Sequence, residues 1–202
     1  MKKKTTLNKN FLIFLTCLLV YPLPVLAHSF TGRIGFYDGL SHPVLGLDHF
    51  LAMLSVGIVS AQIGGKAIWT VPTTFVSIMT IGGLFGFLLI IYEFFFVEVG
   101  IIFSVILLGF AISIDKKIPT KIIILFVGFF GFFHGTAHGI EVPAAANPLL
   151  FLLGFICGTT ALHLFGVAIG YFSTKTIISS IILRLMGISF AIYGIYLLTQ
   201  IF

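Results

Sequence analysis

The sequence contains few charged residues and only two cysteines. Asp, Glu, Lys and Arg together make up 8% of its 202 residues, whereas soluble domains carry about 25%. Hydrophobic residues make up 59% and aromatic residues 15%, and the mean hydropathy is +1.20. This composition excludes a soluble domain and predicts an integral membrane protein.

The scarcity of charge and of cysteine also argues against several function classes. The formal net charge is +5, but most of it comes from four lysines near the N-terminus (Lys2, Lys3, Lys4 and Lys9). Since the rest of the chain is close to neutral, we expect no nucleic-acid partner. Cys17 lies in the same N-terminal segment, so Cys157 would be the single cysteine of the mature chain and could form no intramolecular disulfide. A GxxxxGK[ST] phosphate-binding loop is absent from the sequence.

Residues 1–27 are typical of a secretory signal peptide. They have a basic start, an apolar run over residues 11–20, and Val25 and Ala27 at the small-residue positions of a cleavage site. We therefore predict that residues 1–27 are removed, which leaves His28 as the mature N-terminus. The alternative is an uncleaved first transmembrane helix, but the apolar run is short and is followed by two prolines.

Six apolar stretches follow the signal peptide, each about as long as the ~20 residues that a membrane-spanning helix needs. They cover roughly residues 43–62, 68–91, 95–114, 119–138, 147–171 and 177–200. Residues 28–41 form a short polar lead-in, and the breaks are too short for a second domain. Residues 28–202 are therefore predicted to be one all-α domain of six transmembrane helices in the lipid bilayer.

Charged residues in the breaks alternate by sign. With the mature N-terminus outside, the cytoplasmic breaks carry the lysines (Lys66, Lys116, Lys117, Lys121 and Lys175), and the opposite breaks carry acids (Glu93, Glu98 and Glu141). This distribution follows the positive-inside rule. We predict a multi-pass protein of the bacterial inner (plasma) membrane with a periplasmic N-terminus. The oligomeric state is left open, a homo-oligomer included.

Several glycine pairs are spaced four residues apart within the apolar stretches. They are Gly82 and Gly86; Gly131, Gly135 and Gly139; Gly154 and Gly158; and Gly166 and Gly170. Such spacing lets helix backbones approach closely in a membrane. We interpret these glycines as packing residues, which would bring side chains next to Gly135 within reach of a neighbouring helix.

The string HPVLGLDH, residues 42–49, combines two histidines with a carboxylate at the head of the first apolar stretch. On a regular helix His42 and His49 would lie about 10 Å apart along the axis. They share an ion only if the backbone bends between them, and Pro43 and Gly46 lie in that interval. Asp48 is placed to offset the charge of a cation or to orient the His49 imidazole.

A second string, HGTAHGIE over residues 134–141, ends the fourth stretch. His134 and His138 are four residues apart and share one helix face, which Glu141 continues. Ionisable residues are rare in membrane helices and mark ion pathways there. Two such clusters favour a transition-metal site, although buried histidines also form simple hydrogen bonds between helices.

Four further residues are weaker candidates for metal ligands. His163, deep in the fifth stretch, is equally typical of a ligand and of a packing histidine. His28 offers an amine and an imidazole if cleavage occurs before it. Met53 and Cys157 are interpreted as core residues. Arg184 repels cations, so we expect it to pair with a carbonyl or an acid or to extend to the membrane surface.

Through these motifs the chain resembles the HupE/UreJ family of bacterial membrane proteins. The resemblance runs through HPVLGLDHFLAMLSVG (42–57), the region of Trp69 and Pro72, Glu98, FHGTAHGIEVP (133–143), LHLFG (162–166), and Arg184 with Gly187. This family is associated with hydrogenase and urease accessory functions and with nickel or cobalt uptake. The resemblance implies that the ion is Ni²⁺ or Co²⁺ and that its ligands, or the groups that orient them, are His42, Asp48, His49, His134, His138 and Glu141.

We therefore expect a permease rather than an enzyme, with Ni²⁺ or Co²⁺ as cargo and no prosthetic group, which supports metalloenzyme or cobalamin maturation. Two alternatives use the same residues. One is an intramembrane zinc-dependent hydrolase, in which three histidines and a carboxylate hold the metal, although the chain has no HExxH motif. The other is a metal sensor or chaperone that binds the ion without transporting it.

Overall fold

The computed structural model describes residues 35–89, 95–115, 118–142 and 147–202, and these residues form an all-α structure. The helices are α2 (Phe36–Leu45), α3 (Leu47–Ile63), α4 (Ala67–Leu89), α5 (Phe95–Ile114), α6 (Thr120–Ile140), α7 (Pro148–Ser173) and α8 (Ile177–Ile201). The predicted signal peptide and His28 lie outside the described residues.

Five of these helices, α4 to α8, are long and apolar enough to cross a membrane. The pair α2 and α3 passes the same test as a unit, which raises the number of candidate spans to six if the pair counts as one. The fold is therefore that of a multi-pass helical membrane protein, as the composition indicates. The five single helices agree with the apolar stretches to within a few residues at each end.

The first predicted span is bent sharply. Helices α2 and α3 meet at an angle of 87°, and the residue between them, Gly46, has extended backbone angles (φ −90°, ψ 119°). Pro43 lies inside α2, where its ring removes one backbone hydrogen bond. The backbone therefore does bend between His42 and His49, which is the condition for these two histidines to approach one ion.

The prediction that residues 28–41 are only a polar lead-in is wrong from Phe36 onward, because α2 begins there. Asp38 accepts a hydrogen bond from the backbone N–H of Gly35 at 2.9 Å, which caps the start of the helix. Gly39 is buried, and a Cβ at this position would fall on the carbonyl group of Phe151 in α7. Helix α2 is thus held by close backbone packing rather than by an apolar run.

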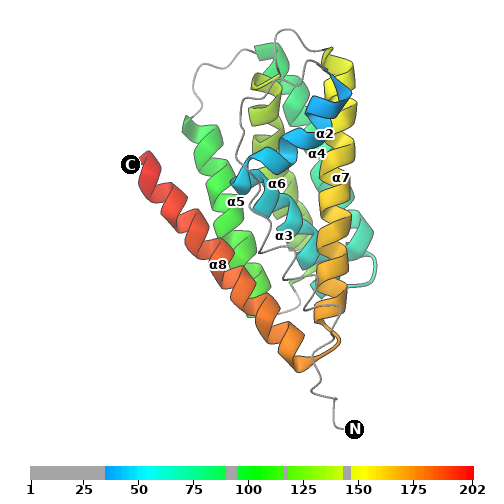
Figure 1. Ribbon diagram of the computed structural model, residues 1–202, viewed down its shortest axis with the longest axis vertical. Coiled ribbons are helices and arrows are strands. Elements are labelled where there is room, and N and C mark those ends of the chain that lie inside the picture. The colour runs from blue at the N-terminus through cyan, green and yellow to red at the C-terminus, as the bar shows by residue number, and fades with distance from the viewer. Residues whose placement is uncertain (1–34, 90–94, 116–117, 143–146) are drawn as a thin grey trace.

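Helix α3 is the centre of the bundle and packs against α7, α5 and α4, with residues buried around its whole circumference. The other close pairs are α4 with α6, α5 with α8, and α2 with α7; Figure 1 shows α5 and α8 together on one side of the molecule and α7 on the other. The spaced glycines mediate these contacts. A Cβ on Gly135 would fall on the carbonyl oxygen of Met79, and one on Gly139 would fall on that of Gly83.

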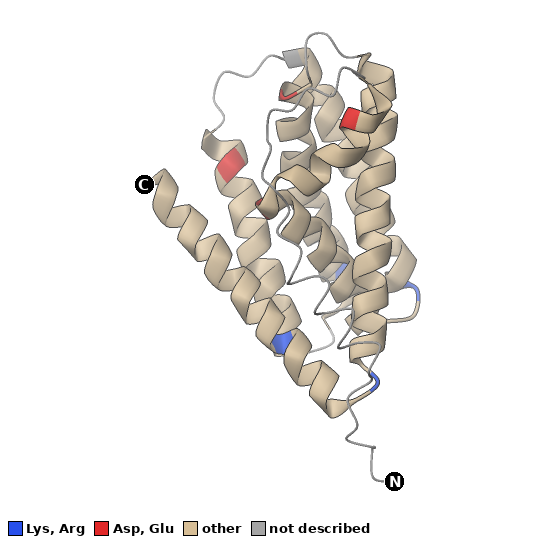
Figure 2. Cartoon of the chain, viewed as in Figure 1, with Lys and Arg blue, Asp and Glu red and all other residues tan. Residues whose placement is uncertain are grey.

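The two ends of the bundle differ in charge. At one end α4, α6 and α8 begin, and Lys66, Lys121 and Lys175 lie in or next to the adjoining breaks; we call this the basic end. At the other end α6 finishes and α7 begins, and we call this the site end. Figure 2 shows acidic residues towards the site end and basic residues towards the basic end. Asp115, at the end of α5, is an acid at the basic end.

Candidate metal centre

Three side chains from the two sequence motifs meet at the site end. Oε2 of Glu141, the C-cap residue of α6, lies 3.0 Å from Nε2 of His42 and 3.2 Å from Nδ1 of His138. These three residues offer ligand atoms that all lie within 4.8 Å of one another. His42 is brought there by α2, which the bend at Gly46 turns across the end of α7 towards α6. We call His42, His138 and Glu141 the outer triad.

Glu141 is the accessible member of the outer triad, with 37% of its side chain exposed. Partial burial raises the pKa of its carboxyl, but the imidazoles of His138 and His42 lower it further than burial raises it. The net effect is a pKa well below the usual value for a glutamate. The carboxylate therefore stays anionic near neutral pH, which suits it to attract and hold a cation.

His49 lies directly behind the outer triad, in the first turn of α3. Its ring centroid is 4.3 Å from that of His138 and 5.1 Å from that of His134. Nδ1 of His49 lies 3.0 Å from Oδ1 of Asp48, which also accepts the backbone N–H of His49 at 2.9 Å. Because a carboxylate accepts only, Nδ1 carries a ring proton in this contact, and Nε2 points away from Asp48.

His134 continues the cluster into the bundle and is held by a residue that the sequence motifs do not include. Nε2 of His134 lies 2.9 Å from Oγ of Ser104 in α5, and this hydroxyl also donates to the carbonyl oxygen of Ile101 at 2.6 Å. The hydroxyl has one hydrogen, so Nε2 of His134 is the donor to Ser104. Nδ1 of His134 is then unprotonated and available as a ligand.

The remaining imidazole nitrogens of these histidines are buried without a hydrogen-bond partner among the described residues. They are Nε2 of His49, Nδ1 of His134 and Nε2 of His138, whereas Nδ1 of His138 faces the Glu141 carboxylate at 3.2 Å. A buried polar group without a hydrogen bond costs about 1–3 kcal/mol, and most such groups in proteins are paired. The lone pairs and the nearby carboxylate are the donor set that Ni²⁺, Co²⁺ and Zn²⁺ accept. Chemically, the cluster fits a divalent transition-metal ion.

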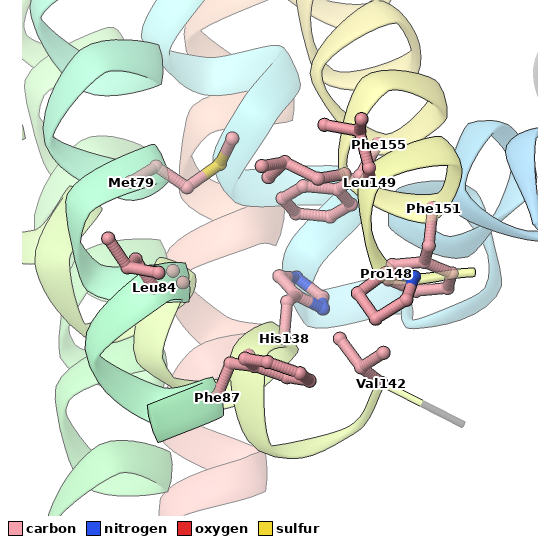
Figure 3. A pocket seen from close by; sticks show the side chains of 13 residues that line it. Met79, Leu84, Phe87, His138, Val142, Pro148, Leu149, Phe151 and Phe155 are labelled. Atoms are coloured by element: carbon pink, nitrogen blue, oxygen red, sulfur yellow. The ribbon is translucent and has the colours of Figure 1, made fainter. Parts of the chain in front are cut away.

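Aromatic side chains and a cavity border the cluster. The ring of Phe155 lies 4.3 Å from that of His138, and the ring of Phe151 lies 5.4 Å from that of His42. A cavity of about 250 Å³ opens between α4, α6 and the start of α7. Figure 3 shows the His138 ring inside this otherwise apolar cavity, near Phe87, Val142 and Pro148. Low polarity around the imidazole strengthens its interaction with a cation.

His163 is separate from the rest of the cluster. It is 1% exposed, and the ring that connects it to the other histidines is that of Phe75, 5.2 Å from His163 and 5.5 Å from His134. Of the predicted metal residues, the structure thus brings together His42, Asp48, His49, His134, His138 and Glu141. It places His163 deeper in the bundle.

The structure also places the remaining candidates. Met53 is fully buried in the core, as expected. The prediction that Cys157 is a core residue is wrong: it is exposed, because it lies six residues from His163 on another face of α7. Arg184 donates from Nε to the carbonyl oxygen of Ser113 at 2.8 Å, which is the expected pairing with a carbonyl.

Sequence reasoning missed Ser104, Phe75 and Phe155. Ser104 stands in an otherwise apolar stretch of α5, and that isolated hydroxyl was the available signal. No sequence feature distinguishes Phe75 and Phe155 from the other phenylalanines, because the chain contains 24 phenylalanines.

Comparison with known proteins identifies the family. No solved structure matches the chain significantly. Protein HupE of Rhizobium leguminosarum bv. viciae is 40% identical over 156 residues, which cover 76% of this chain and 81% of that protein. The sequence model of the HupE / UreJ protein family matches residues 16–197. The match therefore includes both histidine motifs, and the chain belongs to the HupE/UreJ family.

Proposed function

We propose that this protein is an inner-membrane permease that takes up Ni²⁺ or Co²⁺. The observation that carries the proposal is the convergence of two distant motifs on one cluster of buried imidazoles with unpaired nitrogens, next to an anionic carboxylate. The ion is cargo rather than a resident cofactor, and its uptake would support maturation of a metalloenzyme or of cobalamin. The choice of Ni²⁺ or Co²⁺ over Zn²⁺ rests on family membership, since all three accept these ligands.

The charges at the two ends support an orientation in which the ion enters from the periplasm. The lysines in the breaks of the basic end favour a cytoplasmic location for that end. The site end then faces the periplasm. His42 and Glu141, with 26% and 37% of their side chains exposed, are the first ligands that an ion would meet. His138, His49 and His134 follow inward, each ring within 5.1 Å of the next along the series His138, His49, His134.

The membrane potential is a sufficient driving force for this direction. An inside-negative potential contributes about 2.3 kcal/mol per charge for each 100 mV, or about 4.6 kcal/mol for a dication. This free energy corresponds to roughly a thousandfold accumulation. Uptake therefore needs no nucleotide hydrolysis, which agrees with the absence of a GxxxxGK[ST] loop from the sequence.

The test is uptake of radiolabelled Ni²⁺ and Co²⁺ by cells that express the full chain. Wild-type cells should accumulate at least one of these ions above cells with empty vector, and His49→Ala should abolish the excess. His49 is chosen because it contacts both His134 and His138. Accumulation equal in wild type and in His49→Ala, at matched protein levels in the membrane, would show that the chain is not a permease of this kind.

Binding without uptake would favour a sensor or chaperone. Equilibrium dialysis of the purified protein against Co²⁺, in parallel with the uptake assay, separates the two outcomes. The hydrolase alternative requires Zn²⁺ that is retained through purification and turnover of a lipid or peptide substrate.

A further inference from the structure

We propose that His163 and Thr159 form a second ion station inside the bundle, and that the ring of Phe75 is the barrier between this station and the outer histidines. This inference rests on the proposed function for the identity of the ion. Its evidence is the position of three side chains in α4 and α7.

The two histidine groups lie at different depths. The ring of His138 in α6 lies 4.3 Å from that of Phe155 in α7, so these two residues lie at about the same depth from the site end. His134 lies four residues further in, or about 6 Å along α6. His163 lies eight residues beyond Phe155, or about 12 Å along α7. His163 therefore lies about 6 Å deeper than His134, just beyond the middle of α7.

The side chains of His163 and Thr159 carry polar atoms that have no hydrogen-bond partner among the described residues. Both ring nitrogens of His163 and Oγ1 of Thr159 are buried and unpaired. Thr159 is 0% exposed and lies one turn from His163, towards the site end. A histidine with a packing role is expected to hydrogen-bond, whereas here an imidazole and a hydroxyl on one helix face both lack partners. A cation would accept the lone pair of one ring nitrogen of His163 and a lone pair of the Thr159 hydroxyl.

Phe75 contacts both groups. Its side chain is fully buried, and its ring centroid lies 5.5 Å from that of His134 and 5.2 Å from that of His163. An ion that moves directly from one imidazole to the other would pass along this ring. The face of an aromatic ring attracts a cation but provides no lone pair, so it permits passage without holding the ion.

The structure is closed beyond the station. Towards the basic end, Val71 of α4 lies one turn below Phe75, and Ile169 of α7 lies below His163. Both residues belong to the apolar core and are 0% and 2% exposed. An ion at His163 is therefore separated from the basic end by apolar side chains and from the outer cluster by Phe75. The ion station thus lies between Phe75 on one side and the apolar core residues on the other.

The experiment is nuclear magnetic resonance of the full chain in detergent, with histidine rings isotopically labelled and Co²⁺ as the probe. The chain has six histidines, so each ring signal is assigned by single substitution. An imidazole that binds Co²⁺ shows a hyperfine shift far outside the diamagnetic range. The titration is run on wild type, Phe75→Leu, Thr159→Val and, as a control, Phe190→Leu in α8, a buried residue whose ring contacts no described histidine.

In wild type the outer histidines should shift first and His163 should shift only with further Co²⁺ and more slowly. Phe75→Leu should speed the His163 response about tenfold, because leucine keeps an apolar side chain but removes the ring. Thr159→Val should weaken Co²⁺ binding at His163 roughly tenfold, the upper range for one lost polar contact. Phe190→Leu should match wild type both in the rate of the His163 response and in Co²⁺ affinity at His163.

The possible results separate this inference from the proposed function. If the outer histidines shift and His163 does not in wild type or Phe75→Leu, the inner station is wrong and the outer site stands. If Phe75→Leu behaves as Phe190→Leu, Phe75 is not the barrier. If no histidine shifts, both the station and the outer site are wrong. If both groups shift but cells show no uptake, the station stands and the permease proposal fails.

Discussion

The imidazole rings of His49 and His138 lie 4.3 Å apart, centroid to centroid, although the residues belong to different motifs and different helices. The contact depends on the break at Gly46, which lets α2 cross the end of the bundle while α3 runs into its centre. His42 and His49 thereby approach His138 from two directions, with ring centroids 4.8 Å and 4.3 Å from it. The two motifs lie side by side only in this bent arrangement.

Removing the charge of Glu141 should weaken metal binding. Glu141→Gln keeps the size of the side chain but replaces the carboxylate oxygen that lies near His42 and His138. We expect Co²⁺ affinity to fall about 10- to 100-fold, as measured by equilibrium dialysis. Asp115→Asn is the matched control, because Asp115 bonds to Gln62 and Ser180 at the basic end. An equal loss in both variants would mean that the effect is not specific to the site.

Asp48 should act through His49 rather than on the ion. Asp48→Asn removes the charge that holds the Nδ1 proton of His49, and we expect about a 10-fold to 100-fold loss of Co²⁺ affinity. In the double variant with His49→Ala, the substitution at Asp48 should add little further loss, since its partner is already gone. Additive losses would show instead that Asp48 binds the ion directly.

The hydrogen bond between Ser104 and His134 should contribute to stability. Ser104→Ala leaves Nε2 of His134 without its partner, and we expect the free energy of unfolding to fall by about 1–2 kcal/mol. Ser113→Ala is the control, because Ser113 lies in the same helix and, among the described residues, its side-chain hydroxyl bonds only to the carbonyl of Phe110, at 2.8 Å. Denaturation of the two variants in detergent tests the difference, and equal stability would contradict the assigned bond.

Substitution of Gly135, which lies next to His134, should separate two helices and lower the stability of the fold. A methyl group on Gly135 would fall on the carbonyl oxygen of Met79, so Gly135→Ala should push α4 from α6 and destabilise the fold by about 1–3 kcal/mol. Gly128→Ala, in the same helix, would meet only side-chain atoms of Thr74 and Ile78, at 3.8 and 3.9 Å. That variant should be neutral or slightly more stable, since alanine favours helix. Equal melting temperatures would contradict this packing.

Most of the helical architecture could be predicted because each membrane span leaves a long apolar run. Helix α2 left none: it is short, and its place depends on the fit of Gly39 against the backbone of Phe151. The angle at Gly46 is equally a tertiary property. Pro43 and Gly46 indicate where the chain can bend but not by how much, and the 87° angle follows from the packing of α2 on α7.

The candidate site likewise contains residues that the sequence can single out and residues that only the structure reveals. Histidines and acids are rare in an apolar chain, so the sequence alone could single out His42, His49, His134, His138 and Glu141. Ser104 and Phe75 have residue types that are ordinary in such helices, and only contact with His134 makes either of them notable. Cys157 is the opposite case. Its thiol makes it a candidate ligand by residue type, but its position on α7 leaves it exposed and away from the site.

Proteoliposomes show whether the protein itself moves a metal ion across a membrane through the histidine cluster. The purified full chain is reconstituted with a fluorescent metal chelator inside, and Ni²⁺ or Co²⁺ is added outside under an inside-negative potential. We expect rapid quenching for wild type and, for His138→Ala, a rate equal to that of protein-free vesicles, since His138 belongs to the outer triad and also contacts His49. Equal rates for wild type and His138→Ala, or no flux of either ion in wild type, would contradict this expectation.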